Sequence, residues 1–263
     1  MGVNTYSALM RIPGRRTDSV FRRPGGGMPT WAVVVTLGTL SVAMMPRPVV
    51  GPTSQIASAF PSNDDGAEPV ATVFIGDSIT AGSGSTTPSR RWTAIVSARQ
   101  GWIEFNRALA GTGYIADASA AGCGKLECHN YGNAIQALTT LDPSVVVISG
   151  GRNDGPAPQG YSDIVKSTIE AAMTKWPTAQ VFVTSALWDD EPEPDWLAKN
   201  EEIVRAATIE AGATFLDLGQ PIEGRADLVG PDGVHPNDAG YAAIADSWDR
   251  ASEELLLSSE PAG

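Results

Sequence analysis

Apolar runs alternate with longer amphipathic stretches from residue 70 to the end of the chain. Short apolar runs predict five strands, at residues 70–75, 102–106, 144–149, 180–185 and 214–218. Helical periodicity is best at 161–175, 196–211 and 238–256. Runs such as Val-Val-Val-Ile-Ser are apolar on both faces, which is typical of a parallel sheet covered by helices on both sides. The pattern predicts one α/β domain, a three-layer α/β/α sandwich around a five-stranded parallel sheet.

Four polar or glycine-rich motifs follow these strands. They are Gly-Asp-Ser at 76–78, the loop 106–114 with Gly111 and Gly113, the loop 149–155 with Asn153, and the loop 230–238 with Asp232 and His235. In open parallel sheets, ligands bind outside the carboxyl ends of the strands. We therefore expect the four motifs to converge at one edge of the sheet.

The residue types in these motifs suit acyl transfer through a serine. A neutral hydroxyl needs a base within hydrogen-bond reach, and the base needs an orienting acid. His235 is the one histidine on the predicted edge with an acid close by, Asp232, while Ser78 follows the first strand. The backbone N–H groups of Ser78 and Gly111 and the side-chain amide of Asn153 are candidate donors to an oxyanion. For Ser78 alone, the plain alternative is a helix N-cap.

Together, Gly76-Asp77-Ser78-Ile79, Gly111, Gly151-x-Asn153-Asp154 and Asp232-x-x-His235 resemble the four sequence blocks of the SGNH hydrolases, also called GDSL-type esterases and lipases. The blocks have the same order and span residues 70–240. The resemblance implies a flavodoxin-like sandwich that works without a metal or other cofactor. It also implies a site with Ser78 as nucleophile, Asp232 and His235 completing the triad, and Gly111 and Asn153 as oxyanion donors. The second block is a single glycine, so Gly113 is an alternative to Gly111, and Arg152 fills a variable position.

The charge of the chain reverses near residue 60. Residues 1–60 carry a net charge of +5, and residues 61–263 carry −17. The apolar run 31–45 follows several arginines, is short for a membrane span of about 20 residues, and suits the apolar region of a signal peptide. An uncleaved membrane anchor and a buried helix are the alternatives. We expect a signal or anchor within 1–60, a linker at 61–69, the catalytic domain at 70–257, a tail at 258–263, and a secreted or cell-envelope location.

The two cysteines, Cys123 and Cys128, are separated by four residues in a glycine-containing loop. In an exported protein this spacing favours a local disulfide. A metal site formed with His129 is the alternative, but it lacks an evident fourth ligand. The acidic balance of residues 61–263 argues against nucleic acid or an anionic membrane surface as partner, because both favour basic patches. Any membrane association is expected through residues 31–45 only.

The segment 186–196 follows the fourth strand and contains Trp188 and Trp196. These tryptophans either form a wall of the substrate pocket or pack onto the domain; the acids between them would repel anionic substrates. The leading hypothesis is an exported serine esterase acting on a small-molecule, glycan or lipid ester. The alternatives are an acyltransferase for a cell-envelope sugar or lipid and an inactive binding module. The sequence selects neither the acyl chain, the acceptor nor an oligomeric state.

Overall fold

The computed structural model describes residues 69–119 and 128–259. The expected signal or anchor run at 31–45 and Cys123 lie outside these residues. Within them, five strands form one parallel sheet in the order β2-β1-β3-β4-β5. The strands are β1 (Val70–Gly76), β2 (Trp102–Asn106), β3 (Val145–Ser149), β4 (Gln180–Thr184) and β5 (Thr214–Leu216). The predicted five-stranded parallel sheet is confirmed, and its strand order is the flavodoxin-like one.

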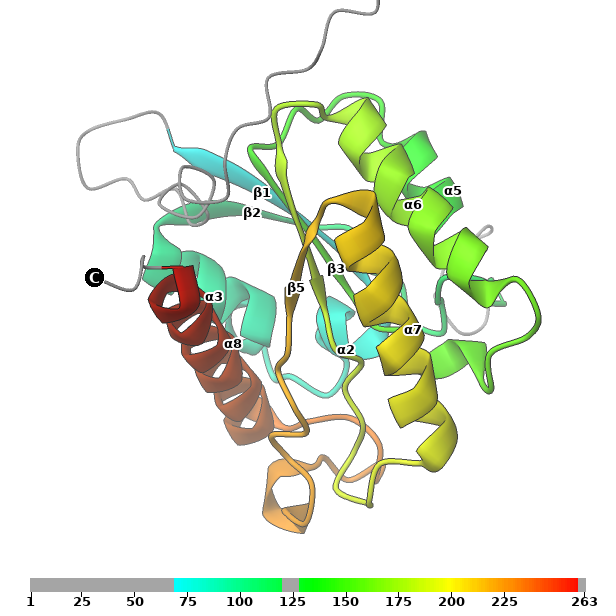
Figure 1. Ribbon diagram of the computed structural model, residues 1–263. Helices are drawn as coiled ribbons and strands as arrows, with labels where there is room; N and C mark the ends of the chain where they lie inside the picture. Colours follow the sequence, from blue (N-terminus) through cyan, green and yellow to red (C-terminus); the bar gives the residue numbers. More distant parts are fainter. Residues whose placement is uncertain (1–68, 120–127, 260–263) are drawn as a thin grey trace, which may run out of the picture. The chain divides into compact units, whose positions relative to one another are not determined.

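Helices cover both faces of this sheet (Figure 1). One face packs against α3 (Trp92–Gln100) and α8 (Asp238–Ser259), and the other against α5 (Tyr131–Ala137), α6 (Tyr161–Lys175) and α7 (Asp195–Ala211). The three-layer α/β/α sandwich is therefore confirmed. Within residues 69–119 and 128–259, no helix has the length and apolar character needed to cross a membrane.

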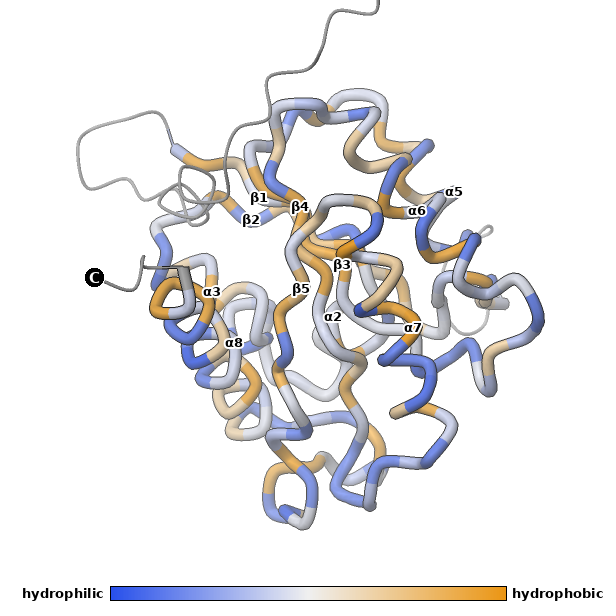
Figure 2. The backbone as a smooth tube through the Cα atoms, in the orientation of Figure 1, coloured by the Kyte–Doolittle hydropathy of each residue, from blue (hydrophilic) through white to orange (hydrophobic). Residues whose placement is uncertain are grey.

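The layer between the sheet and α3/α8 contains a cluster of large aromatic rings. The ring centroid of Trp248 on α8 lies 5.9 Å from that of Trp92, 6.2 Å from that of Trp102 and 6.0 Å from that of Phe182. Trp92 is buried on α3. Figure 2 shows that hydrophobic stretches of the backbone gather along the central strands. Because both faces of these strands are covered, their sequence shows apolar runs instead of strict alternation.

The boundaries of the elements differ from the sequence prediction in a few places. β4 and β5 end earlier than expected because the N–H of Leu218 donates to the hydroxyl of Ser185, at 2.8 Å, instead of to a strand carbonyl. The periodicity had not identified α3, whose buried face includes the polar residues Thr93 and Ser97. α5 has only seven residues, too few for a clear period. α8 continues to Ser259.

The strand order creates one switch point, between β1 and β3. The chain first moves from β1 to one neighbour, β2, and then crosses to β3 on the other side of β1. Loops that leave β1 and β3 at their carboxyl ends diverge there, and ligands of such sheets bind in the space between them. The loop after β1 carries Ser78 and the loop after β3 carries Asn153. The fold therefore places both motifs beside the switch point.

We expect Trp248→Ala to destabilise the protein by about 3–5 kcal/mol, because it removes a fully buried ring that contacts three others. Leu257→Ala on the same helix is the control: its side chain is 73% exposed, and its loss should change stability by no more than about 0.5 kcal/mol. Urea unfolding monitored by circular dichroism measures both. Equal effects of the two substitutions would contradict the assigned core.

Candidate active site

The turn after β1 brings Ser78 to the edge of the sheet. A Cβ at Gly76 would lie 2.3 Å from the carbonyl oxygen of Ser149, so only glycine allows the end of β1 to lie this close to β3. Asp77 caps the short helix α2 (Ser78–Ala81) by accepting a hydrogen bond from the Ile79 N–H at 3.0 Å. Ser78 is the first residue of α2 and is 9% exposed. The capping role considered for Ser78 therefore belongs to Asp77.

The loop after β2 is bound to the same turn. The N–H of Leu109 donates to the carbonyl oxygen of Gly76 at 2.8 Å, and the hydroxyl of Thr112 donates to it at 3.3 Å. Gly111 has φ +80°, which favours glycine, and within the described residues its N–H makes no hydrogen bond. The N–H of Gly113, by contrast, donates to the Ala116 carbonyl at 3.0 Å. Of the two glycines, Gly111 is thus the one with an available donor.

Asn153 lies on a one-turn 3₁₀ helix, η2 (Arg152–Asp154), directly after β3. Its side-chain amide donates to the carbonyl oxygen of Thr112 at 2.9 Å, which holds the amide beside the loop of Gly111. Asn153 is exposed, and an amide nitrogen carries two N–H groups. One N–H therefore positions the side chain, and the other is free to bind a ligand.

Asp154 anchors the loop that follows Gly111. Its carboxylate accepts hydrogen bonds from three successive backbone N–H groups, those of Tyr114, Ile115 and Ala116, at 3.0, 3.0 and 2.9 Å. It also accepts one from the hydroxyl of Tyr161 at 2.8 Å. In the structure it stabilises a neighbouring loop that begins 40 positions earlier.

Asp232 and His235 form a close pair after η3 (Ala226–Leu228). The Nδ1 atom of His235 lies 2.6 Å from Oδ2 of Asp232. The other carboxylate oxygen accepts hydrogen bonds from the N–H groups of His235 and Val234, at 3.0 and 3.1 Å. Hydrogen bonds from the His235 backbone, the His235 ring and the Val234 backbone lower the pKa of Asp232 to about 2. Asp232 is therefore ionised at neutral pH, and it orients the imidazole with Nε2 facing away.

Contacts between distant segments bring the His235 loop against the segment that follows α2. The carboxylate of Asp238 accepts hydrogen bonds from the backbone N–H and the hydroxyl of Thr86, at 2.9 and 2.6 Å. The hydroxyl of Tyr241 donates to the carbonyl of Ser83 at 2.6 Å. A Cβ at Gly84 would lie 3.1 Å from Cβ of His235, which shows how closely the two loops approach.

Within the described residues, no hydrogen bond joins the Ser78 hydroxyl to the His235 imidazole. His235 nevertheless lies close enough to Asp77, the neighbour of Ser78, to lower the pKa of the Asp77 carboxyl. The structure therefore brings the two loops together while leaving the serine–histidine contact open. Such contacts often tighten only when a substrate binds.

Asp77 is a buried carboxyl directly beside the candidate nucleophile. Burial raises its pKa to about 6, and this effect is opposed by the positive charge of Arg152 and by backbone hydrogen bonds from Ile79 and Thr80. Its surroundings differ sharply from those of the exposed Asp232. Two carboxyls at one sheet edge thus have pKa values about four units apart.

Arg152 takes part in contacts that its variable position in the motif did not suggest. Its Nη2 atom lies 3.0 Å from Oδ2 of Asp189, and its guanidinium carbon lies 4.2 Å from the centroid of the Trp188 ring. Trp188 in turn makes an edge-to-face contact with Trp196, with ring centroids 5.8 Å apart. Trp188 therefore packs against Arg152 and Trp196 and is partly exposed. The sequence did not reveal that Asp189, an acid after β4, pairs with the arginine after β3.

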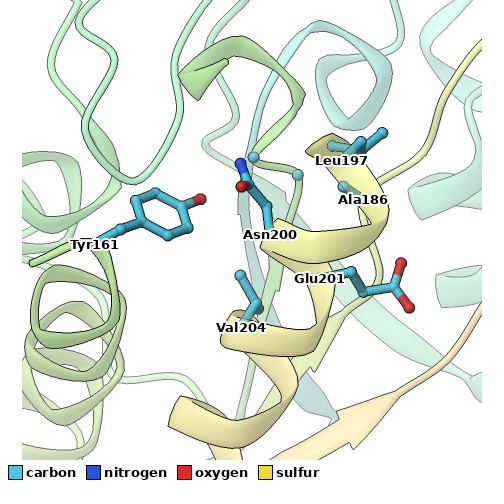
Figure 3. A pocket seen from close by; sticks show the side chains of 8 residues that line it. Tyr161, Ala186, Leu197, Asn200, Glu201 and Val204 are labelled. Carbon is cyan, nitrogen blue, oxygen red and sulfur yellow. The ribbon is translucent and has the colours of Figure 1, made fainter. Parts of the chain in front are cut away.

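A small cavity lies behind the β3–η2 loop (Figure 3). Its volume is about 10 Å³, near the least that one water molecule needs. Tyr161 and Asn200 point toward one another across it, while the carboxylate of Glu201 points away. The Asn200 amide donates to the Gly155 carbonyl at 2.7 Å and accepts from the Ala157 N–H at 3.0 Å. The cavity is too small for an acyl chain, and the residues around it support the loop.

The predicted disulfide is not tested by these residues. Cys128 is buried, whereas Cys123 lies in 120–127, outside the described residues, so the Cys123–Cys128 bond stays a prediction. Within residues 69–119 and 128–259, no cluster of three or more histidine, cysteine or acidic side chains is arranged to hold a metal ion.

Comparison with known proteins identifies the class. Residues 74–243 match the GDSL-like Lipase/Acylhydrolase family. A GDSL lipase from Mycobacterium tuberculosis is 33% identical over 187 residues, which make up 65% of this chain and 77% of that protein. The chain belongs to the GDSL-like lipase/acylhydrolase family, as the four motifs indicated. It is accordingly a serine hydrolase that acts on ester bonds.

Solved structures share the fold at lower identity. A carbohydrate esterase family 2 enzyme from Corynascus thermopiles (Myceliophthora fergusii) is similar with a TM-score of 0.53 and 21% identity, over 73% of this chain and 68% of that one. A salicylyl-acyltransferase from a tetracycline biosynthetic pathway is similar with a TM-score of 0.56 and 19% identity, over 73% of this chain and 56% of that one. Both hydrolysis and transfer therefore occur on this fold.

Asp77→Asn should stabilise the protein at neutral pH. The pKa of Asp77 is higher in the folded protein than the ordinary 3.8, so this group's contribution to stability falls as the pH rises from about 4 to about 6. Above that range the buried charge costs up to roughly 3 kcal/mol, whereas asparagine is uncharged and still accepts a capping hydrogen bond. We expect a clear rise in Tm at pH 8 and a much smaller one at pH 4. An equal rise at both values, or a rise in the exposed control Asp163→Asn, would contradict this reasoning.

Asn153→Ala should lower kcat by about 10²–10³-fold, the usual effect of removing one oxyanion donor. KM should change little, because the missing N–H binds the charge that develops during the reaction. Steady-state hydrolysis of a p-nitrophenyl ester measures both constants. Asn153→Asp, which keeps the shape but replaces the donor by a carboxylate, should be at least as damaging. A kcat within threefold of wild type in the alanine variant would exclude Asn153 as a donor.

Proposed function

We propose that this protein is an exported esterase that transfers the acyl group of a carboxylic ester first to Ser78 and then to water. The observation that carries the proposal is the Asp232–His235 pair, at 2.6 Å, held against the loop that follows Ser78. The free N–H of Gly111 and the amide of Asn153 lie at the same edge of the sheet. Nucleophile, base, acid and oxyanion donors are the complete set that serine acyl transfer needs.

In the first half of the proposed reaction, Nε2 of His235 accepts the proton of the Ser78 hydroxyl as Oγ attacks the ester carbonyl carbon. Ionised Asp232 stabilises the imidazolium that forms. The carbonyl oxygen becomes an oxyanion and accepts hydrogen bonds from the N–H groups of Ser78 and Gly111 and from the Asn153 amide. The bond to the alcohol oxygen then breaks, and the imidazolium gives its proton to the leaving alcohol.

The second half repeats these steps with water. His235 takes a proton from a water molecule, whose oxygen attacks the acyl carbon. The same donors stabilise the second oxyanion, and its collapse releases the carboxylic acid and returns the proton to Ser78. Because the pKa of Asp232 is about 2, the acid partner stays charged at every pH at which the imidazole acts as a base.

We place the substrate among small-molecule, glycan and lipid esters, with a short acyl or acetyl group. The lipase relative from Mycobacterium tuberculosis and the carbohydrate esterase of the same fold support this range. Export is supported by the basic segment 1–60 and its apolar run 31–45, which also provides the proposed route to any membrane association. The net charge of −17 over residues 61–263 argues against nucleic acid as a partner.

A second candidate is transfer of the acyl group to a sugar or lipid hydroxyl of the cell envelope. The similarity to a salicylyl-acyltransferase supports this second candidate. The same residues would serve hydrolysis and transfer, because only the acceptor of the acyl group differs. An inactive binding module has less support, because the chain retains the serine, histidine, aspartate and both oxyanion donors.

Ser78→Ala should abolish turnover of p-nitrophenyl esters, with a fall in kcat on the order of 10⁶-fold. The chain-length series from acetyl to decanoyl measures the depth of the acyl site at the same time. Ser89→Ala, an exposed serine in the same region, is the control and should keep full activity. Residual turnover near wild type in Ser78→Ala would refute the serine mechanism.

Adding sugar or alcohol acceptors to the same assay separates the two candidates. Formation of a new ester, with faster release of p-nitrophenol, would identify a transferase. Release of free acid alone at high acceptor concentration supports hydrolysis.

A further inference from the structure

The Arg152 side chain is buried although its neighbour Asn153 is exposed. Its exposed fraction is 9%, and that of the Asp189 side chain with which it pairs is 10%. The Trp188 ring covers the guanidinium at 4.2 Å. We call Arg152, Trp188 and Asp189 the arginine clamp. It joins the loop after β3 to the loop after β4, and both loops belong to the edge of the sheet that carries the site.

Stability alone does not account for this clamp. Removing two charges from water costs free energy that a single ion pair often fails to recover. The Nη1 atom of Arg152 is also buried without a hydrogen-bond partner among the described residues, which adds to the cost. A cation kept under these conditions next to an oxyanion donor points to a role in the reaction.

The clamp acts on the turn that carries Ser78. Burial raises the pKa of Asp77, and among the surrounding charges that of Arg152 opposes this rise most strongly. Gly150, two residues before Arg152, also packs against this carboxyl: a Cβ there would lie 2.8 Å from Oδ2 of Asp77 and 2.1 Å from the hydroxyl of Tyr131. The loop of Arg152 and the turn of Ser78 are therefore in direct contact.

The Asp77 carboxyl has two unfavourable effects that a nearby cation offsets. Its carboxylate holds the Ile79 and Thr80 N–H groups at the start of α2, and this support weakens if the carboxyl is protonated. When ionised, its negative charge opposes the oxyanion that forms beside Ser78. The other titratable groups facing Asp77 are His235 and the buried phenols of Tyr131 and Tyr241. A guanidinium stays charged at any working pH. It favours the ionised form of Asp77, and its positive charge offsets the negative charge of this carboxylate near the oxyanion.

We propose that Arg152 is a positioning residue: held by Asp189 and Trp188, it fixes the loop that carries Asn153 and keeps the Asp77 carboxylate charged and compensated beneath Ser78. The inference rests on the proposed esterase function. Arg152 touches no reacting atom in this scheme and acts through Asn153 and Asp77.

The test compares Arg152→Gln and Arg152→Lys with wild type. Arg152→Gln should lower kcat on the order of 10²-fold with KM nearly unchanged, because the oxyanion donor is misplaced. It should also move the acidic limb of the kcat/KM profile to higher pH, since Asp77 then protonates more readily. Arg152→Lys keeps the charge but not the planar fork. Arg152→Lys should therefore leave the acidic limb at its wild-type pH and recover part of kcat.

Arg205→Gln is the control. Arg205 lies on α7, contacts the Phe215 ring at 4.2 Å and pairs with Asp217 at 2.5 Å, so it has the same kinds of partner as Arg152, but its side chain is 42% exposed and it lies away from Ser78. It should change neither kcat nor the pH profile. A second test uses the Asp77→Asn background, in which Arg152→Gln should no longer shift the acidic limb.

The outcomes separate this inference from the proposed function. If the rate at which an organophosphonate labels Ser78 is the same in wild type and folded Arg152→Gln, Arg152 has no positioning role. The inference would also be overturned if Arg152→Gln shifted the acidic limb of the kcat/KM profile as much in the Asp77→Asn background as in the wild-type background. Absence of labelling in wild type itself would refute the serine mechanism, and with it the basis of the inference. The inference is supported if the organophosphonate labels Ser78 more slowly in Arg152→Gln than in wild type and if Arg152→Lys restores part of the labelling rate.

Discussion

The close approach of β1 and β3 at Gly76 is the constraint on which the site depends. Only a residue without a side chain fits against the Ser149 carbonyl there. The Gly76 carbonyl in turn accepts hydrogen bonds from Leu109 and Thr112, which hold the loop of Gly111. The Thr112 carbonyl then accepts the Asn153 amide. The turn of Ser78 and the loops of Gly111 and Asn153 are thus connected, through a few hydrogen bonds, to one point at the switch of the sheet.

Three aspartates at this edge illustrate how environment sets the role of a carboxyl. Asp232 accepts hydrogen bonds from backbone and imidazole, and its pKa falls to about 2. Asp77 is buried, its pKa rises to about 6, and it caps the helix that begins with Ser78. Asp154 accepts three backbone N–H groups and a phenol, and it shapes a loop. The same side chain therefore orients an imidazole, caps a helix and anchors a loop.

The same fold occurs in proteins named for different reactions. It is shared with a carbohydrate esterase at 21% identity and with a salicylyl-acyltransferase at 19% identity. Residues that bind ligands lie disproportionately on loops, and the segment after β4 contains Trp188, Asp189 and Trp196. That segment is joined to the loop of Asn153 by the ion pair of Arg152 and Asp189. The positions of the two loops are therefore coupled.

The sequence by itself determined whatever depends on neighbours in the chain. Apolar runs placed the five strands, helical periodicity placed α6 to its last residue, and the i, i+3 spacing anticipated the Asp232–His235 pair. The four motifs in order were enough for the family. Periodicity failed for α3 and α5, where polar residues on the buried face or short length conceal the pattern.

Only the tertiary structure decided which distant groups meet. The link of Asp154 to a remote loop and the pairing of Arg152 with Asp189 both depend on which loops lie side by side. The approach of His235 to the Ser78 turn relies on a bond between Tyr241 and Ser83, 158 positions apart. The spacing of residues along the chain does not indicate such contacts, because they follow from the strand order and from how the helices pack across the sheet.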